Sequence, residues 1–327
     1  MSLDADQIVD RRRMRRKLTL WRGVAVVAIL FAVIGIVALA LPDSWRASSR
    51  PGTGIARITI EGLSRTNQKR VEALDRLSRS KAAAVIVYIN SPGGTTAGAE
   101  QLYDSLTRLR EKKPMVVVVG GLAASGGYIA ALPAEYIVSS QTSLVGSIGV
   151  LFQYPNVSDL LKTIGVKVEE IKSSPLKAAP NGYEPTSPEA RAAIEAIVKD
   201  SYAWFRGLVA ERRHLDADAL EQVADGRVFT GRQAVQLKLV DALGDERTAR
   251  EWLAKEKNID IKTPVRDYPL TSRFSDLPFP FVAISRALQA VGLTELAQRV
   301  QDWGAVQAIE RLNLDGLLAL WHPPATN

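Results

Sequence analysis

The sequence lacks cysteine and has only two histidines among its 327 residues. Without cysteine, the chain has no structural disulfide, no thiolate nucleophile and no cysteine-ligated metal site. His214 lies in the charged run 211–216 and His322 in a proline-rich tail, so neither is placed as a buried general base. We expect no metal and no cofactor, and any base that the chemistry requires must be another residue type.

Most of the net positive charge comes from one short segment. The formal net charge is +7, but six of the seven residues from Arg11 to Lys17 are basic. This cluster adjoins an apolar segment rather than aromatic residues on a folded surface, so it does not indicate a nucleic-acid partner. The overall content of 46% hydrophobic and 24% charged residues is typical of a folded protein.

Charge is absent altogether from residues 23–42. About 20 apolar residues suffice for a helix to cross a bilayer, so we predict a transmembrane anchor at 20–42 after a cytoplasmic basic segment at 1–19. Trp21 and Trp45 flank the uncharged run as interfacial residues do, and the positive-inside rule places the rest of the chain outside the cytoplasm. The alternative is a cleaved signal peptide, because 38–40 (Ala-Leu-Ala) resembles a cleavage site, but the apolar run exceeds the usual length.

Residues 43–54 have the Ser, Pro and Gly content of a linker. Beyond them, strand patterns alternate with helical spacing of apolar residues, which predicts an α/β domain with mainly parallel strands at 55–250. The expected strands are 55–60, 84–89, 115–119 and 136–139, and the expected helices are 66–79 and 97–112. The glycines at 146–151 indicate close backbone packing or a tight bend.

Helices are also expected in the second half of the chain. Thr186 and Glu189 fit a capping box for a long helix that ends near Arg213. Residues 246–258 have the pattern of a polar amphipathic helix. Residues 251–327 are interpreted as a C-terminal helical extension, with amphipathic helices at 282–302 and 304–321.

Two turns of small residues follow neighbouring buried strands. Ser125 lies in the turn 124–127, at the start of a helix, and a second turn spans 90–94. Because ligand sites of α/β sheets lie at the carboxyl ends of strands, the two turns together could form an oxyanion hole around a serine nucleophile. The competing interpretation of Ser125 is a simple helix N-cap.

A serine nucleophile needs a base, and lysine is the natural substitute for histidine in this chain. Lys172 and Lys177 both occur in the sparsely charged segment 171–180. A lysine that loses hydration among small and apolar groups can accept a proton near neutral pH. The spacing alone does not choose between the two.

Five motifs, in this order, resemble the signal peptide peptidase A (SppA) family: 90–94 (Asn-Ser-Pro-Gly-Gly), 123–128 (Ala-Ala-Ser-Gly-Gly-Tyr), 146–150 (Gly-Ser-Ile-Gly-Val), 225–231 and 239–244. The resemblance covers about residues 55–250 and is strongest for the short bacterial form with a single membrane anchor. It implies a ClpP/crotonase-like α/β fold that follows one N-terminal transmembrane helix.

The resemblance also implies roles for individual residues. Ser125 would be the nucleophile and Lys177 the general base, although Pro175 and Ala178 depart from the family's usual flanks. Gly94 and Gly126 would supply the backbone donors of the oxyanion hole, and Ser147 would hydrogen-bond the lysine or the nucleophile.

Members of this family assemble as rings around an enclosed bowl, in some cases with serine and lysine from neighbouring subunits. We therefore expect a homo-oligomer anchored in the bacterial cytoplasmic membrane, with its protease domain on the extracytoplasmic side, that degrades cleaved signal peptides and other hydrophobic peptides. One alternative is a membrane-anchored protein on the same fold that binds peptides without cutting them. Another is a crotonase-type acyl-CoA enzyme, which an exported domain disfavours.

Overall fold

The computed structural model describes residue 21, residues 54–270 and residues 317–320. The predicted basic segment, the anchor apart from Trp21, and nearly all of the linker lie outside these residues. Within the described residues, no helix combines the length and the apolar character needed to cross a bilayer. The predicted helix at 282–302 also lies outside them.

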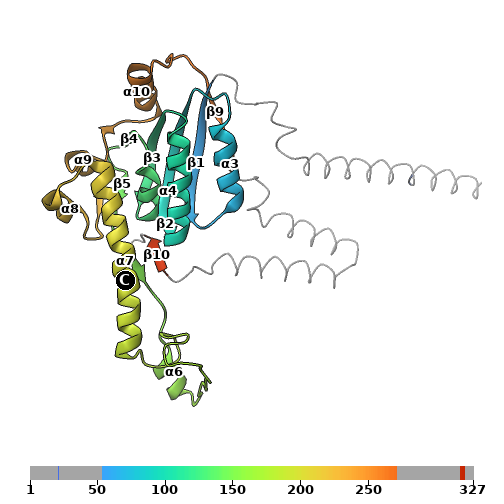
Figure 1. The fold of residues 1–327 in the computed structure, drawn as a ribbon, viewed down its shortest axis with the longest axis vertical. Coiled ribbons are helices and arrows are strands. Elements are labelled where there is room, and N and C mark those ends of the chain that lie inside the picture. The colour runs from blue at the N-terminus through green and yellow to red at the C-terminus, as the bar shows by residue number, and fades with distance from the viewer. Residues whose placement is uncertain (1–20, 22–53, 271–316, 321–327) are drawn as a thin grey trace, which may run out of the picture. The chain divides into compact units, whose positions relative to one another are not determined.

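The core of the fold is a parallel β-sheet (Figure 1). β1 pairs with β2, β2 with β3, β3 with β4 and β4 with β8, all in parallel, and the short β9 pairs in parallel with β1. This confirms the predicted α/β class with mainly parallel strands. The strands are β1 (Ile55–Ser64), β2 (Ala84–Thr95), β3 (Met115–Ala124), β4 (Tyr136–Ser139), β8 (Ala242–Leu243) and β9 (Val265–Asp267).

Helices cover both faces of this sheet. Val85, Val87 and Ile89 of β2 belong to a large hydrophobic core that includes residues of α3 (Gln68–Ser78), α4 (Thr96–Arg110) and α5 (Gly126–Ala131). Ala84 and Ile86, on the opposite face of β2, belong to a smaller core with residues of α10 (Glu246–Lys257). A strand that is buried on both faces has no polar alternation, which explains the continuous apolar runs in the sequence.

The carboxyl ends of the central strands carry additional short strands. β5 (Leu144–Gly146) pairs in parallel with the end of β3 and antiparallel with β7 (Val228–Thr230). β10 (Leu317–Leu320) pairs antiparallel with both β2 and β6 (Leu151–Phe152). The expected helix at 304–321 is therefore wrong at its C-terminal end, because a short apolar run fits a buried strand as well as a helix. β9 and β10, which both follow residue 250, join the same sheet.

The longest described helix is α7 (Pro188–Arg213). The predicted capping box is wrong by one residue: Ser187 is the N-cap, and its hydroxyl accepts from the Ala190 N–H at 3.1 Å. Pro188 then occupies the first helical turn, where its missing N–H costs nothing. The remaining helices are α6 (Ser158–Thr163), α8 (Ala217–Val223) and α9 (Gly231–Gln236).

Residues 153–187, called here the projecting segment, connect β6 to α7. Figure 1 shows that α6 and the N-terminal part of α7 extend beyond the end of the sheet. Phe205 and Val209, in the C-terminal half of α7, are fully buried, whereas Ile197 in the N-terminal half is 49% exposed. α7 therefore contacts the hydrophobic core along its C-terminal half.

Candidate active site

The two turns of small residues lie together at the carboxyl edge of the sheet. The pairing of β2 with β3 sets Ser91 beside Ala123, two residues before Ser125. The contact is close enough that a Cβ on Gly127 would lie 2.4 Å from the Ser91 carbonyl oxygen. Only a residue without a side chain fits at Gly127, so glycine there is a condition for the two turns to meet.

Ser125 has an unusual backbone conformation between β3 and α5. Its φ is 53° and its ψ is −118°, a region that costs a residue with a side chain about 1–3 kcal/mol. Its N–H donates to the Gly146 carbonyl at 2.7 Å, and its carbonyl accepts from the N–H groups of Tyr128 and Ile129. The N-cap side chain makes no capping hydrogen bond. Ser125 is thus at the N-cap position of α5, but its hydroxyl does not cap the helix.

The Ser125 hydroxyl instead lies near the loop that follows β5. Its Oγ is 3.5 Å from the Gly149 carbonyl oxygen, a long hydrogen bond, and the residue is 1% exposed. Gly146 and Gly149 thus contact the backbone and the side chain of Ser125 from either end of one short loop. The glycines at 146–151 indicated close backbone packing, but nothing in their spacing identified Ser125 as the residue they contact.

Gly94 and Gly126, the predicted oxyanion donors, lie on the two adjacent turns. Gly126 is the first residue of α5, where the N–H has no intrahelical acceptor. Gly94 lies opposite Ser64 of β1, and a Cβ at this position would be 2.0 Å from the Ser64 carbonyl oxygen. The turn before it is held by Ser91, whose Oγ donates to the Gly62 carbonyl at 2.7 Å and accepts from the Gly93 N–H at 3.2 Å.

Ser147 lies between the two glycines whose carbonyls contact Ser125. It has a positive φ of 52°, is 7% exposed, and its N–H donates to the Arg227 carbonyl at 2.8 Å. The tight backbone contact at this position is thus observed. A hydrogen bond from its hydroxyl to the lysine or to the nucleophile stays a prediction.

The two candidate lysines have different surroundings in the projecting segment. Lys172 Nζ forms ion pairs with Glu170 at 2.6 Å and Glu184 at 2.7 Å. Hydrogen bonds to these two carboxylates raise the pKa of Lys172, which keeps it charged. Lys177 is exposed, and across the described residues no hydrogen bond or ion pair joins its amine to another side chain. Lys172 is therefore unsuited to be a base, while the Lys177 amine is unpaired and, within the described residues, forms no hydrogen bond with Ser125.

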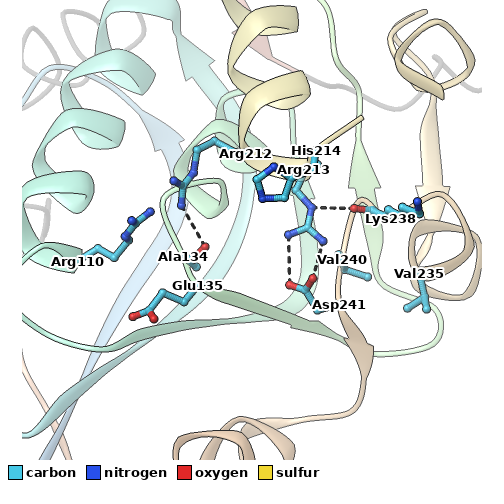
Figure 2. A pocket seen from close by; sticks show the side chains of 10 residues that line it. All are labelled: Arg110, Ala134, Glu135, Arg212, Arg213, His214, Val235, Lys238, Val240 and Asp241. Carbon is cyan, nitrogen blue, oxygen red and sulfur yellow. Dashed lines mark hydrogen bonds and ion pairs between the residues drawn. The ribbon is translucent and has the colours of Figure 1, made fainter. Parts of the chain in front are cut away.

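A cavity of about 730 Å³ lies elsewhere, near the end of α7 (Figure 2). Several of its side chains are basic, and two of these, Arg212 and Arg213, already have partners. Arg213 forms an ion pair with Asp241 at 2.7 Å, and Arg212 donates to the Leu132 and Pro133 carbonyls at 2.9 and 3.0 Å. His214 is the C-cap of α7 and lines this cavity. Ser125 does not line it, so the cavity is not the candidate active site.

The contacts behind this cavity nevertheless hold the serine-bearing helix in place. Tyr128 is fully buried, and its hydroxyl donates to the Leu239 carbonyl at 2.7 Å. Arg213 donates to the neighbouring Lys238 carbonyl, and Asp241 accepts from the Ile137 N–H, both at 2.7 Å. Together with Arg212, these bonds attach α5 to α7 and to the strand edge, which fixes the turn that contains Ser125.

Two family profiles match the chain. The Peptidase family S49 profile matches residues 107–260, and the Clp protease profile matches residues 59–140. A candidate protease of Synechocystis sp. is 36% identical over 218 residues, which is 66% of this chain and 79% of that protein. The chain belongs to peptidase family S49. The family match identifies it as a serine peptidase of the signal peptide peptidase type.

Two further relatives of this S49 peptidase differ from it in length. Protease 4 of Salmonella typhi is 38% identical over 166 residues, or 50% of this chain and 27% of that protein. A candidate signal peptide peptidase SppA of Enterococcus faecium is 31% identical over 201 residues, or 61% of this chain and 58% of that protein. The S49 peptidase thus matches less than two thirds of the length of either relative.

Proposed function

We propose that the protein is a membrane-anchored endopeptidase that uses a Ser125–Lys177 dyad to degrade cleaved signal peptides and other hydrophobic peptides. The observation that carries this proposal is Ser125 itself: a buried serine on a strained turn, with its hydroxyl not used for capping, beside a second turn of glycines. Strained backbone of this kind is found at functional sites, where the surrounding structure holds it.

The proposed reaction is acyl transfer followed by hydrolysis. Lys177 accepts the Ser125 proton, and Ser125 Oγ attacks the scissile carbonyl carbon. The backbone N–H groups of Gly94 and Gly126 bind the oxyanion, and each such donor is worth about 3–4 kcal/mol in acyl transfer. The lysine then protonates the leaving amine, and water releases the acyl-enzyme with Lys177 again as the base.

We propose further that Lys177 acts on Ser125 of a neighbouring copy of the chain. Lys177 belongs to the projecting segment and makes no side-chain bond to Ser125 in one described chain. This segment also exposes an unusual number of large apolar side chains. They are Leu160, Ile164, Val166, Val168, Ile171, Leu176 and Tyr183, each at least 46% exposed. A surface of this kind favours packing against another subunit, in accord with the expected homo-oligomeric ring.

An extended peptide would bind by strand addition. β10 (Leu317–Leu320), an apolar segment, pairs antiparallel with β2 at Gly93–Thr95, a stretch that includes the proposed oxyanion donor Gly94. This edge of β2 is thus able to bind an added apolar strand, and main-chain hydrogen bonds to such a strand accept many sequences. This supports hydrophobic peptides as the substrate class.

Membrane anchoring rests on the uncharged run at 23–42 and the basic cluster before it. Together they favour a single-pass protein of the bacterial cytoplasmic membrane with its N-terminus in the cytoplasm. The full chain should stay in the membrane fraction after an alkaline carbonate wash, whereas a chain that begins at residue 43 should be released. Release of the full chain would contradict the anchor.

The catalytic assignment is tested with detergent-solubilised protein and an apolar fluorogenic peptide. Ser125→Ala and Lys177→Ala should each lower kcat by about 10³-fold or more while the chain stays folded. Lys172→Ala is the matched control, because it removes a neighbouring lysine that is already paired with two carboxylates. Activity that survives Lys177→Ala and is lost in Lys172→Ala would overturn the choice of base.

Mixing the two inactive variants tests whether the dyad forms between subunits. If serine and lysine come from different copies, a mixed oligomer of Ser125→Ala and Lys177→Ala chains contains some sites with both wild-type residues. Co-expression of the two variants should therefore restore part of the activity. No recovery, in mixed oligomers confirmed by differently tagged chains, would contradict a shared dyad.

The absence of a hydrogen bond between Lys177 and Ser125 within the described residues also favours a second candidate, a peptide-binding protein without catalysis. A fluorophosphonate probe distinguishes the two, because it reacts with an activated serine hydroxyl and not with an ordinary one. Labelling of the wild type that is lost in Ser125→Ala supports the peptidase, and absence of labelling in both supports the binder.

A further inference from the structure

β10 occupies a slot in the sheet that has a neighbouring strand on each side. It lies between β2 and β6 in the sheet and pairs antiparallel with each of them. Leu318 is paired with Thr95 of β2 on one side and with Leu151 of β6 on the other. Along the described part of the chain, β6 joins the sheet only through β10. Removing β10 would therefore leave a gap one strand wide.

Both walls of this slot belong to the candidate active site. On the β2 side, Ala319 is paired with Gly94, the proposed oxyanion donor. On the β6 side, the wall begins two residues after Gly149, whose carbonyl oxygen is 3.5 Å from Ser125 Oγ. Any strand in this slot thus lies along the segments that flank the nucleophile.

The segment that fills the slot has the character expected of a substrate. Leu317–Leu320 reads Leu-Leu-Ala-Leu, an extended apolar stretch. Leu318 is 8% exposed, so its side chain is buried, and β10 also contacts α4, which begins directly after β2. With this arrangement Ser125 is 1% exposed, so a peptide cannot reach the hydroxyl unless a neighbouring segment moves.

We infer that residues 317–320 form a built-in competitive inhibitor that occupies the peptide-binding slot of the chain and must leave before substrate binds. The inference rests on the proposed function, because it takes the slot beside Ser125 as the substrate site. The physical reason is exclusion: the backbone N–H and C=O groups at the edges of β2 and β6 can pair with only one strand at a time. Since the segment is part of the chain, its local concentration far exceeds that of dilute substrate.

A binding experiment tests the slot without depending on catalysis. The probe is a fluorescent synthetic peptide of residues 314–323, and both proteins carry Ser125→Ala so that nothing is cut. A chain that ends after Gly316 should bind the probe about tenfold more tightly than the full chain, because the slot is vacant. The matched control ends after Leu320; it retains β10 and should bind the probe as weakly as the full chain.

The kinetic consequence is measured on the active forms of the same chains. Ending the chain after Gly316 should lower KM for an apolar peptide about tenfold and leave kcat unchanged, since a competitive occupant affects only access. Ending it after Leu320 should change neither. The free 314–323 peptide should restore the higher KM of the chain that ends after Gly316.

Leu318→Asp in the full chain provides a second route if the shorter chain does not fold. A charged side chain at this buried position should expel β10 from the slot. Both probe binding and KM should then match the values expected for the chain without β10. Circular dichroism confirms that each variant is folded.

The outcomes separate the two proposals. Equal probe binding by the full and shortened chains, or a folded chain without β10 that loses activity, would overturn the inhibitor and make β10 an ordinary structural strand. Tighter probe binding without peptidase activity in any form would retain the slot and its occupant and refute the proposed catalysis.

Discussion

The turn that contains Ser125 and the segment that contains Lys177 are held in place by different kinds of contact. The turn around Ser125 is fixed by residues distant in sequence: Ser91, Gly146 and, through Tyr128, Leu239. The projecting segment is held mainly by bonds within itself, such as that from the Val157 N–H to the Gly182 carbonyl at 2.8 Å. The first region is buried and fixed by the sheet, while the second is largely exposed.

This difference matters for an active site whose serine and lysine come from two different subunits. The nucleophile, with its strained backbone and flanking glycines, is already arranged within a single chain. Among the described residues, the Lys177 side chain forms no comparable set of hydrogen bonds. If a neighbouring subunit completes the site, activity depends on assembly, and a lone chain keeps its reactive parts apart. The predictions below test whether the two regions differ in this way.

The largest effect is expected from Gly94→Ala. The new Cβ would lie 2.0 Å from the Ser64 carbonyl oxygen, so the two strands must separate, at a cost of about 3 kcal/mol in the free energy of unfolding. Activity should fall with it, because the proposed oxyanion donor moves. The control is Gly207→Ala in α7, where nothing lies within 4 Å of the added Cβ. That change should stabilise the chain by about 0.5–1 kcal/mol. Urea unfolding measures the free energy of unfolding of both variants. Equal changes in Gly94→Ala and Gly207→Ala would contradict the expected difference between the two positions.

An intermediate effect is expected from Tyr128→Phe. The change leaves the Leu239 carbonyl without its buried donor and should lower the free energy of unfolding by about 2 kcal/mol. Burial raises the pKa of Tyr128, so its hydroxyl stays protonated and remains a donor at all ordinary pH values. Tyr183→Phe, in the projecting segment, is the control and should change stability by less than about 0.5 kcal/mol. Thermal denaturation compares the stability of the two variants. If Tyr128→Phe were as stable as the wild type, the bond from Tyr128 to Leu239 would not anchor α5.

The smallest effect concerns the Lys172–Glu184 ion pair of the projecting segment. Lys172 lowers the pKa of Glu184, so the stability from this pair is present above the unfolded carboxyl pKa of about 4.3 and is lost as pH falls through the lower folded value. Below that range, the amides of 168–186 should exchange faster with solvent while those of β2 and β3 stay protected.

Glu184→Gln is the control for this ion pair. It should remove most of the pH dependence of the projecting segment, because the amide does not titrate. This pH dependence is measured as amide hydrogen exchange, corrected for the intrinsic effect of pH on the exchange rate. Equal loss of protection in the sheet and in the segment would show that the two regions unfold together.

Much of the sheet could be predicted from the sequence, because apolar runs such as 84–89 and 115–119 are the direct mark of strands buried on both faces. The two turns could also be predicted to meet, since both follow strands of one parallel sheet. The strand at 317–320 could not be, because four apolar residues suit a helix or a strand equally until a partner edge is known. The N-cap of α7 was misplaced by one residue because Thr186 and Ser187 are both good caps.

By itself, the sequence determined the α/β class, the serine in its turn of small residues, and the exclusion of cysteine chemistry. These follow from local composition and periodicity, which each segment carries independently of its neighbours. Only the tertiary structure decided that Gly146 and Gly149 contact Ser125 and that Lys172 forms ion pairs with two carboxylates. It also decided that β10 fills the slot beside the candidate site. Such contacts join residues far apart in the chain, and their geometry exists only once the sheet has formed.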